Sequence, residues 1–348
     1  MTETLHEKGV EPPMVSVVIP TRDRRLALER CLDALAYQTH ANYEVIVVDD
    51  GSSDDTQAFL QQFTADHPGL QLTCLRNDTP IGANGSRNRG IGIAEGRFVA
   101  FIDSDCVAEG DWLEELVRGF TGQRVAAVTG TVRNPPPANI YELTYRGTNR
   151  VHGSPYVTRL VGCNMGIRRE LLLTYMLDED RAARVTNPDG MTDDITVSGR
   201  GDEEGLYLML RAAGYEQLAA PDAVVLHEHH YTGRTFFKQA FRGGRSAARL
   251  VYKYYLPPRL DMLPFMLTYL TLPLLLVQRW LGLLPAVFFA AALAAIVYND
   301  LFRKGKTIGE TVRSFPVLLA YYHVRLFGYV TEAICLRLGK HEITRQRL

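Results

Sequence analysis

Two acidic residues with one serine between them follow a short apolar run in this chain. The stretch FVAFIDSDC covers residues 98–106, so Asp103 and Asp105 come directly after residues suited to a buried strand. Aspartate and serine are common in turns and helix caps, so a turn is the simplest interpretation. The alternative is a divalent-cation site, because carboxylate oxygens are preferred ligands of hard cations such as Mg²⁺. The elements around the pair bear on this choice.

Strand-like and helix-like segments alternate around this pair, from residue 14 to residue 132. Short β-branched apolar runs such as MVSVVIP and YEVIVVDD are typical of buried parallel strands. The predicted strands are residues 14–20, 43–50, 70–76 and 97–103. Helical spacing of apolar residues or a helix-start signal predicts helices at 24–38, after the GSSDDT stretch at 51–56, and at 85–96.

This alternation predicts an α/β fold with a mostly parallel, doubly wound sheet. Ligands of such sheets bind beyond the carboxyl ends of the strands. Asp49 and Asp50 end one predicted strand, and Asp103 and Asp105 end another. We therefore expect all four carboxylates at one edge of the sheet.

Composition narrows the class of protein. The net charge of -1 gives no general basic field, which argues against a nucleic-acid-binding protein. Five cysteines without CxxC spacing favour reduced thiols over a disulfide framework or a zinc site. The polar stretch MTETLHEKGVEPPMV has no apolar core of a signal peptide, so we expect the front of the protein in the cytoplasm.

Apolar residues gather after residue 260. Residues 262–277 and 280–298 are almost free of charge, and the second segment is about long enough to cross ~30 Å of hydrocarbon. Both flanks are basic: Arg245, Arg249, Lys253 and Arg259 precede them, and Arg303, Lys304 and Lys306 follow. A helical hairpin or re-entrant pair keeps both flanks on the cytoplasmic side and is favoured; a single span and an interfacial pair remain open. Residues 315–338 predict an amphipathic helix, either on a membrane surface or packed on the α/β part.

Seven motifs resemble, in order, those of glycosyltransferase family 2, whose members are inverting enzymes with the GT-A fold. The resemblance covers roughly residues 14–245. The motifs are VSVVIPTRDR, YEVIVVDDGSSDDT, GANGSRNRGI, FIDSD, VGCNMGIRRELL, GDEEGLYLMLRAAGY and PDAVVLHEHHYTG. The resemblance implies a GT-A fold, followed here by a membrane-associated helical segment.

On the donor side, the resemblance implies a nucleotide-diphosphate sugar with Mg²⁺ or Mn²⁺. The implied metal ligands are Asp103, Asp105 and His227, and a metal there neutralises the leaving diphosphate. The implied nucleotide-sugar contacts are Pro20, Thr21, Arg22, Asp49, Asp50, Arg87, Asp103 and Ser104. Ser52, Ser53 and Asp54 are better explained as a turn that caps the next helix. His229 and His230 receive no separate role.

The acceptor side is less regular. Family members usually carry Glu-Asp where this chain has Asp202 and Glu203, so the resemblance favours Glu203 as catalytic base, with Asp202, Asp194 and Glu204 as alternatives. An acceptor that is already an ionised phosphate needs less help from a base. Further acceptor-side or diphosphate-side candidates are Gly162, Cys163, Asn164, Gln239, Arg242 and Arg245.

The stretch KQAFRGGR, which holds the last three of these candidates, loosely resembles a segment of membrane polysaccharide synthases. Those synthases place a Gln-x-x-Arg pattern near the diphosphate and follow it with a tryptophan. Gly243 stands at the tryptophan position here, which argues against a processive polymerase. A basic helix face on anionic lipid is an equal interpretation of the stretch.

The sequence thus predicts a membrane-associated, metal-dependent hexosyltransferase of cell-surface glycan or glycolipid synthesis. The predicted donor is a UDP-sugar, and the predicted acceptor is lipid-linked or a polyprenyl phosphate at the cytosolic membrane face. The alternative is a catalytically silent, sugar-nucleotide-binding scaffold. A dinucleotide-dependent oxidoreductase is excluded, because no GxGxxG joins the first strand to a helix. Self-association into a homo-oligomer is left open.

The same interpretation divides the chain into six segments. They are a flexible N-terminus (1–13), a nucleotide-sugar-binding half (14–132), an acceptor-side half with the base (133–232), a basic interface helix (233–260), a membrane-embedded hairpin (261–299) and a C-terminal amphipathic helix (300–348).

Overall fold

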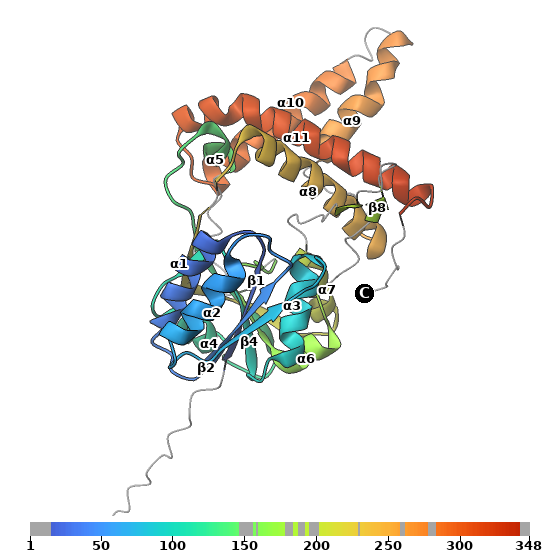
Figure 1. Cartoon of the computed structure of the whole chain (residues 1–348). Coiled ribbons are helices and arrows are strands. Elements are labelled where there is room, and N and C mark those ends of the chain that lie inside the picture. Colours follow the sequence, from blue (N-terminus) through green and yellow to red (C-terminus); the bar gives the residue numbers. More distant parts are fainter. Residues whose placement is uncertain are drawn as a thin grey trace, which may run out of the picture. The chain divides into compact units, whose positions relative to one another are not determined.

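The chain forms two compact units, described from a computed structural model (Figure 1). The first comprises Met1–Thr131, Val151–Met176 and Tyr215–Val225, and the second comprises Val132–Arg150, Leu177–Gly214 and Leu226–Leu348. The structure describes residues 15–145, 156–157, 159–177, 184–186, 192–194, 202–228, 230–257, 262–277 and 283–341.

An eight-stranded sheet has the strand order β3-β2-β1-β4-β7-β6-β10-β5. Its strands are β1 (Val15–Thr21), β2 (Tyr43–Asp49), β3 (Leu72–Arg76), β4 (Phe98–Phe101), β5 (Cys106–Ala108), β6 (Val125–Arg133), β7 (Met165–Arg168) and β10 (Glu216–His227). β1 pairs in parallel with β2 and β4, and β2 pairs in parallel with β3. The predicted α/β fold with a mostly parallel sheet is confirmed, and the four predicted strands are present.

One strand departs from the doubly wound pattern. β7 pairs antiparallel with both β4 and β6, which makes the sheet mixed. A parallel neighbour requires a crossover connection, and a strand that returns in the opposite direction does not. The first half of the chain follows the crossover rule, and β7 is the point at which the sheet stops being parallel.

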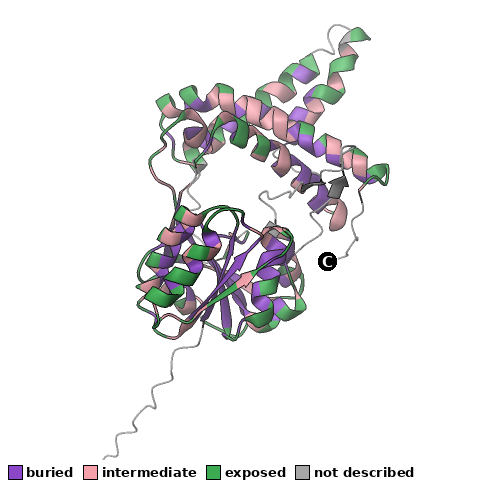
Figure 2. Ribbon diagram, in the orientation of Figure 1, coloured by how far each residue is buried: buried purple, intermediate pink, exposed green. Residues whose placement is uncertain are grey.

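Helices cover this sheet through apolar stripes. They are α1 (Arg25–Ala36), α2 (Thr56–Asp66), α3 (Gly82–Ile93), α4 (Trp112–Arg118) and α6 (Arg169–Thr174). α1 buries Leu28, Cys31, Leu32 and Leu35, which recur at helical spacing. β1 and β4 are buried along their whole length, as Figure 2 shows by colour. The core of the first unit therefore lies between the sheet and these helices.

The second unit is mostly helical. Its helices are α5 (Ile140–Tyr145), α7 (Asp202–Ala212), α8 (Gly233–Lys253), α9 (Leu263–Thr271), a 3₁₀ segment (Leu272–Leu276), α10 (Leu283–Tyr298), a π-helical turn (Asn299–Arg303) and α11 (Ile308–Arg337). A two-stranded ribbon joins β8 (Arg184–Thr186) and β9 (Thr192–Asp194). Capping boxes start α8 at Thr232 and α11 at Thr307, so both long helices begin at defined residues.

α8 and α11 cross with their backbones in contact, at a glycine from each helix. A Cβ atom on Gly244 would lie 1.9 Å from the carbonyl oxygen of Arg325, and one on Gly328 would lie 2.2 Å from that of Phe241. Real Cβ atoms do not approach backbone that closely. Gly243, one residue earlier, has no atom within 4 Å of such a Cβ. Of the two glycines in the RGGR stretch, the second, Gly244, is therefore the one that this helix crossing requires.

A buried carboxylate joins these two helices. Glu332 of α11 is fully buried and accepts hydrogen bonds from Nε of Arg245 and Nε of Arg249, each at 2.6 Å; Nδ1 of His341 lies 2.9 Å from it. Burial opposes ionisation of Glu332, but the two arginines outweigh it and hold the pKa of this carboxyl below its usual value. Arg245 and Arg249 are thus structural ion-pair partners.

A second buried carboxylate lies at the end of α10. Asp300 is fully buried and binds Nζ of Lys306 at 2.6 Å and Nζ of Lys304 at 2.8 Å. Lys306 also donates to the hydroxyl of Ser314 and to the carbonyl of Thr144. Four basic residues that flank the apolar segments in the sequence are thus ion-paired within the second unit: Arg245, Arg249, Lys304 and Lys306.

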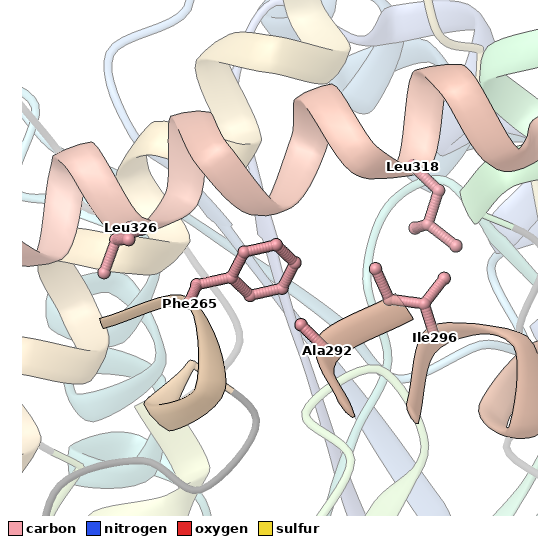
Figure 3. Packing of buried hydrophobic residues seen from close by; sticks show 5 residues of the cluster. All are labelled: Phe265, Ala292, Ile296, Leu318 and Leu326. Atoms are coloured by element: carbon pink, nitrogen blue, oxygen red, sulfur yellow. The ribbon is translucent and has the colours of Figure 1, made fainter. Parts of the chain in front are cut away.

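α9 and α10 form an apolar arm whose base packs on α11. The base is a cluster of buried residues: Phe265, Ala292, Ile296, Leu318 and Leu326 (Figure 3). Among the described residues, one helical stretch, Leu283–Phe302, is long and apolar enough to cross a membrane, and Leu263–Leu274 is a shorter apolar helix. The predicted helix at 315–338 is present within α11.

Candidate functional site

The acidic pair that follows β4 is both a turn and a paired-charge site. The amide of Cys106 donates to the carbonyl of Asp103 at 2.9 Å, which closes a turn around Ser104. Nη2 of Arg87 donates to Asp103 at 2.6 Å, and Nη1 of Arg24 donates to Asp105 at 2.5 Å. Asp103 keeps 30 % of its side chain exposed and Asp105 keeps 15 %. Both carboxylates are therefore held in place and still reachable from solvent.

Three side chains with potential metal-ligating atoms come together at this pair. His227 is the last residue of β10, and one of its ring nitrogens groups with a carboxylate oxygen of Asp103 and one of Asp105, all within 4.8 Å of one another. Two carboxylates and an imidazole suit Mn²⁺, and the carboxylates suit Mg²⁺. The donor set therefore fits the metal implied by the sequence.

Two thiols lie next to the same histidine. Cys106 and Cys163 are buried, and their sulfur atoms and a ring nitrogen of His227 also lie within 4.8 Å of one another. Burial raises the pKa of the Cys106 thiol well above its usual value. Neither cysteine is in a disulfide bond.

Asp49 and Asp50, at the end of β2, hold the neighbouring loops together. Asp49 is fully buried and accepts from the Ser52 amide at 2.8 Å, Gln57 at 2.6 Å and Arg76 at 2.7 Å. Asp50 accepts from the amides of Ile81 at 2.7 Å and Gly82 at 2.9 Å, at the start of α3. A negative charge stabilises a helix N-terminus, so Asp50 fixes the position of α3.

α3 in turn carries Arg87. Its guanidinium is buried, with 4 % of the side chain exposed, and bonds to Asn84 at 3.1 Å as well as to Asp103. Arg87 is therefore part of the structure around the acidic pair and not an exposed surface arginine. Asp50, α3, Arg87 and Asp103 thus form one continuous series of contacts from β2 to the end of β4.

The loop after β1 is fixed to the loop after β2. Asp23 has a left-handed backbone (φ 50), which aspartate tolerates better than most residues. Its carboxylate accepts from the amide and hydroxyl of Ser53, and its own amide donates to the hydroxyl of Ser52. The Ser53 amide is the main cause that lowers the pKa of Asp23. The predicted turn is present, since the Ser52 amide donates to Asp49. Ser52 and Ser53 serve this loop contact and do not cap α2, whereas the Asp54 carboxylate accepts from the amide of Thr56, the first residue of that helix, at 3.2 Å.

Three predicted donor-side residues lie in or next to this loop. Pro20 and Thr21 end β1, where both are buried. The Thr21 hydroxyl is buried without a hydrogen-bond partner among the described residues, which is unusual for a buried hydroxyl. Arg22 is 44 % exposed, 3.7 Å from Asp23. The orphan hydroxyl and the exposed arginine lie at adjacent positions at the carboxyl end of the first strand.

The Gly162–Asn164 segment has a structural role at Asn164. This side chain is fully buried; its amide nitrogen donates to the carbonyls of Thr131 and Ala223, both at 2.9 Å, and its oxygen accepts from the Trp112 indole at 2.8 Å. A Cβ on Gly130 would lie 2.5 Å from this amide, so glycine there leaves room for it. Asn164 therefore ties β6, β10 and α4 together, and its polar atoms are used within the protein.

The remaining acceptor-side candidates lie in the second unit. Glu203 is half-buried on α7; Asp202 is the first residue of that helix, and its side chain is outside the described residues, as are that of Asp194 and all of His229. Gln239 and Arg242 are half-buried on α8. The pKa of Arg242 is lowered, mainly by burial and to a lesser extent by the nearby charge of Arg245. The placement of Arg245 on the diphosphate side is not supported by its contacts, which go to Glu332.

Sequence reasoning missed four residues that shape the site: Arg24, Arg76, Asn77 and Trp112. Arg24 and Arg76 neutralise Asp105 and Asp49, and Asn77 donates to Asp50 at 2.8 Å. Arg24 lies inside the VSVVIPTRDR motif, so its position at the end of the first strand was a usable signal. The others are brought to the site by tertiary contacts that no local pattern encodes.

Comparison with known proteins adds a family. Residues 16–175 match the family described as glycosyl transferase family 2. Over 134 residues the chain is 37 % identical to glycosyltransferase AglE of Haloferax volcanii, covering 38 % of this chain and 41 % of that protein. Over 189 residues it is 28 % identical to a teichuronic acid biosynthesis glycosyltransferase, TuaG, of Bacillus subtilis, covering 51 % and 66 %. The matched part thus spans less than two thirds of these relatives' own lengths.

Solved structures show the same fold. A mannosyltransferase of Pyrobaculum calidifontis in complex with GDP-Man and Mn²⁺ superposes with a TM-score of 0.59 at 20 % identity, covering 91 % of this chain and 87 % of that one. GalNAc-T7 with UDP, GalNAc and Mn²⁺ gives 0.51 at 16 % identity, over 71 % and 52 %. The sheet, the motifs and the family match agree: residues 16–175 match glycosyl transferase family 2, and the chain has a GT-A-like fold.

Proposed function

We propose that this protein is an inverting glycosyltransferase that transfers a hexose from a nucleotide-diphosphate sugar, with UDP as the first nucleotide to test, to a lipid-linked or polyprenyl-phosphate acceptor. The observation that carries the proposal is the arginine-held carboxylate pair Asp103 and Asp105, with His227 in the same donor set. Its homologues include a Campylobacter jejuni enzyme whose name describes glucosyl transfer to an undecaprenol-diphosphate-linked glycan, matched over 27 % of this chain.

The donor side has three parts in this proposal. The orphan hydroxyl of Thr21 and the exposed guanidinium of Arg22 bind the nucleotide and its diphosphate. Asp49 and Asp50 act by holding the loops and α3 at this edge, since their oxygens already accept hydrogen bonds from the protein. Any direct hydrogen bond from a base or ribose uses the lone pairs that remain, because a carboxylate offers about four.

Asp103, Asp105 and His227 would hold Mn²⁺ or Mg²⁺. When bound, such an ion supplies Lewis-acid neutralisation of the diphosphate as it leaves. Arg87 and Arg24 orient the two carboxylates before any ligand binds, because each already donates to one of them. This preorganisation lowers the cost of forming the site.

The acceptor needs a group that removes its proton as the bond to the anomeric carbon forms. Glu203, half-buried on α7, is our candidate for a hydroxyl acceptor. A phosphate acceptor is already ionised and needs no such base. Glu203→Gln should therefore lower transfer to a hydroxyl acceptor by roughly 10²–10⁴-fold, and should leave transfer to a polyprenyl phosphate nearly unchanged. Asp202→Asn is the matched variant, since it removes the neighbouring acid instead.

The test is a transfer assay with the full chain. Sugar nucleotides are incubated with membrane lipid extract and Mn²⁺, and products are identified by mass spectrometry. We expect a glycosylated lipid with the anomeric configuration inverted relative to the donor. Tight donor binding with neither transfer nor donor hydrolysis would instead establish the scaffold alternative, which the reversed order of Asp202 and Glu203 favours.

A further inference from the structure

The apolar arm has a buried base and an exposed distal part. Ala292 and Ile296 of α10 and Phe265 of α9 are 1 %, 3 % and 2 % exposed in the cluster on α11. We call residues 269–277 and 283–291 the distal arm. Its exposed large apolar side chains are Tyr269, Leu270, Leu272, Leu276, Val277, Leu283, Leu284 and Val287. A patch this large is uncommon on a water-facing surface and marks a binding surface.

The described residues of the distal arm offer water almost nothing polar. None of them is charged, and the Thr271 hydroxyl donates to the carbonyl of Leu267 at 2.7 Å. The other hydroxyl in these ranges is that of Tyr269, which is 50 % exposed. Gln278 and Arg279 follow in the sequence and are outside the described residues. At the arm's base, the Thr268 hydroxyl likewise donates to the carbonyl of Pro264 at 2.8 Å. Side-chain polar groups satisfied within their own helix are what a hydrocarbon environment demands.

The length of the distal arm is that of one leaflet. Nine residues of α10 come before Ala292, which is about 13 Å at 1.5 Å per residue. Most of them are exposed, but Pro285 is buried and Phe289 packs against the cluster at the arm's base. Half of a hydrocarbon core of ~30 Å is about 15 Å. The rest of α10 cannot enter lipid without losing its packing, because its buried face contacts α11 and its end leads to the Asp300 ion pairs.

α11 continues the same surface beyond the arm. Residues four apart lie on one face of a helix. Leu326 is 7 % exposed under the arm, and the next three positions in its series, Val330, Ile334 and Leu338, are 41 %, 51 % and 64 % exposed. Arg337 and Lys340 are exposed beside this stripe, while the acid of the region, Glu332, is buried on the face toward α8. An apolar stripe flanked by cations is suited to the surface of an anionic bilayer.

We propose that the distal arm inserts into a single leaflet of an anionic bilayer, with the second half of α11 lying in the headgroup region, so that the chain is held monotopically and α10 does not span. This inference extends the proposed function, on which its biological purpose rests, to the partner that holds the enzyme. This arrangement is the re-entrant form of the hairpin that the sequence favoured, and it differs from the single span.

The test measures depth in vesicles with the full chain. Cys74 and Cys335 are replaced by serine, and an environment-sensitive fluorophore is attached to Leu276→Cys, Ile334→Cys or Tyr37→Cys. Tyr37 is 79 % exposed in the first unit and is the control. In phosphatidylglycerol-containing vesicles we expect quenching of the Leu276 site by lipids spin-labelled deep in the acyl chain, quenching of the Ile334 site by headgroup-labelled lipids, and none at Tyr37. Absence of quenching at Leu276 would overturn the proposal.

A second measurement separates insertion from spanning. Val277→Cys in the same background is treated with a membrane-impermeant thiol reagent either outside or inside the vesicles. We expect protection from both sides, and labelling from the interior would show that the arm crosses. Arg337→Gln with Lys340→Gln should weaken binding to the anionic vesicles by roughly 25-fold, while Arg118→Gln with Arg124→Gln, in the first unit, should not. An equal effect of both pairs would refute the headgroup contact.

An activity assay distinguishes failure of membrane insertion from failure of the proposed reaction. Each variant is also assayed in detergent with a short-chain, water-soluble acceptor. Unchanged transfer there, together with failed insertion, would overturn only the membrane inference. Absence of transfer with normal insertion would overturn only the proposed function.

Discussion

The two units use clusters of acids and cations in opposite ways. In the first, Asp103 and Asp105 follow a strand, keep part of their surface exposed, and each pair with one arginine, of which Arg24 is 52 % exposed. In the second, Glu332 and Asp300 are fully buried, and each binds two cations. A half-open pair can exchange a protein cation for a ligand, whereas a closed cluster can only hold helices together. The comparison predicts that mutations of the first kind change activity and those of the second kind change stability.

The largest expected effect is on catalysis. Asp105→Asn should lower transfer by about a thousandfold or more, because several kcal/mol of charge stabilisation is lost and each 1.36 kcal/mol is tenfold in rate. The free energy of unfolding should change by less than about 1 kcal/mol, since the pair with Arg24 is partly exposed. Turnover with varied Mn²⁺ concentration measures the first, and urea unfolding measures the second. Asp33→Asn, an exposed acid on α1, is the control; unchanged turnover in Asp105→Asn would end the metal-ligand assignment.

The next effect is on stability. Glu332→Gln leaves Arg245 and Arg249 buried without their counter-charge, which should cost about 3–5 kcal/mol. Glu29→Gln, which breaks a partly exposed pair with Arg25, should cost less than about 1 kcal/mol. Hydrogen exchange in the α8 and α11 peptides measures the local loss. Equal exchange in both variants would mean that the buried cluster is not what holds the helices.

The same carboxyl gives a pH dependence. The pKa of Glu332 is below its ordinary value of 4.5 in the folded state, so the unfolded state binds more protons in acid. Its contribution is therefore fully present above about pH 4.5 and is lost as pH falls through the lowered folded-state pKa. Exchange of α8 and α11 should rise in that acid range in the native chain. In Glu332→Gln this rise should be smaller, and an identical rise would assign it to other groups.

A smaller effect on stability is expected to differ between two adjacent glycines, Gly243 and Gly244. Gly244→Ala places a Cβ against the carbonyl of Arg325 and should destabilise the second unit by about 1–3 kcal/mol. Gly243→Ala meets open space and should be neutral or stabilise by up to about 1 kcal/mol through helix propensity. Thermal unfolding of the two variants in detergent provides the comparison. Similar melting temperatures would show that α8 and α11 can separate at the crossing without cost.

The smallest effect tests a support residue of the open site. Arg76→Ala removes one of three donors to Asp49 and should raise the KM for the donor roughly fivefold, for a loss of about 1 kcal/mol, with kcat nearly unchanged. Arg76→Lys retains the charge and should recover part of this loss. A fall in kcat at constant KM would place Arg76 in the reaction rather than in the support of the loop.

The sequence could predict features that depend on neighbouring residues, but not contacts between residues that are far apart in the chain. The four predicted strands and the position of Asp103 and Asp105 depend on local runs of apolar and turn residues, and these were correct. The partners Arg76 and Asn77 lie 27 residues from Asp49 and Asp50, so no local pattern joins them. Arg245 and Arg249 look like a basic surface in the sequence because their partner Glu332 is more than eighty residues away. Asn164 shows the same limit, since its three partners come from three different elements.

α8 and α11 are far apart in the sequence, so the ribosome completes them at different times. Glu332 follows Arg249 by 83 residues and Arg245 by 87. At roughly 5–20 residues per second, the ribosome adds that length in about 4–17 s. Throughout this interval α8 has been made without the helix that covers its arginines and its Gly244 surface, and the arm emerges before the helix that packs on its base. The apolar arm therefore meets its surroundings first, and α11 closes the unit last.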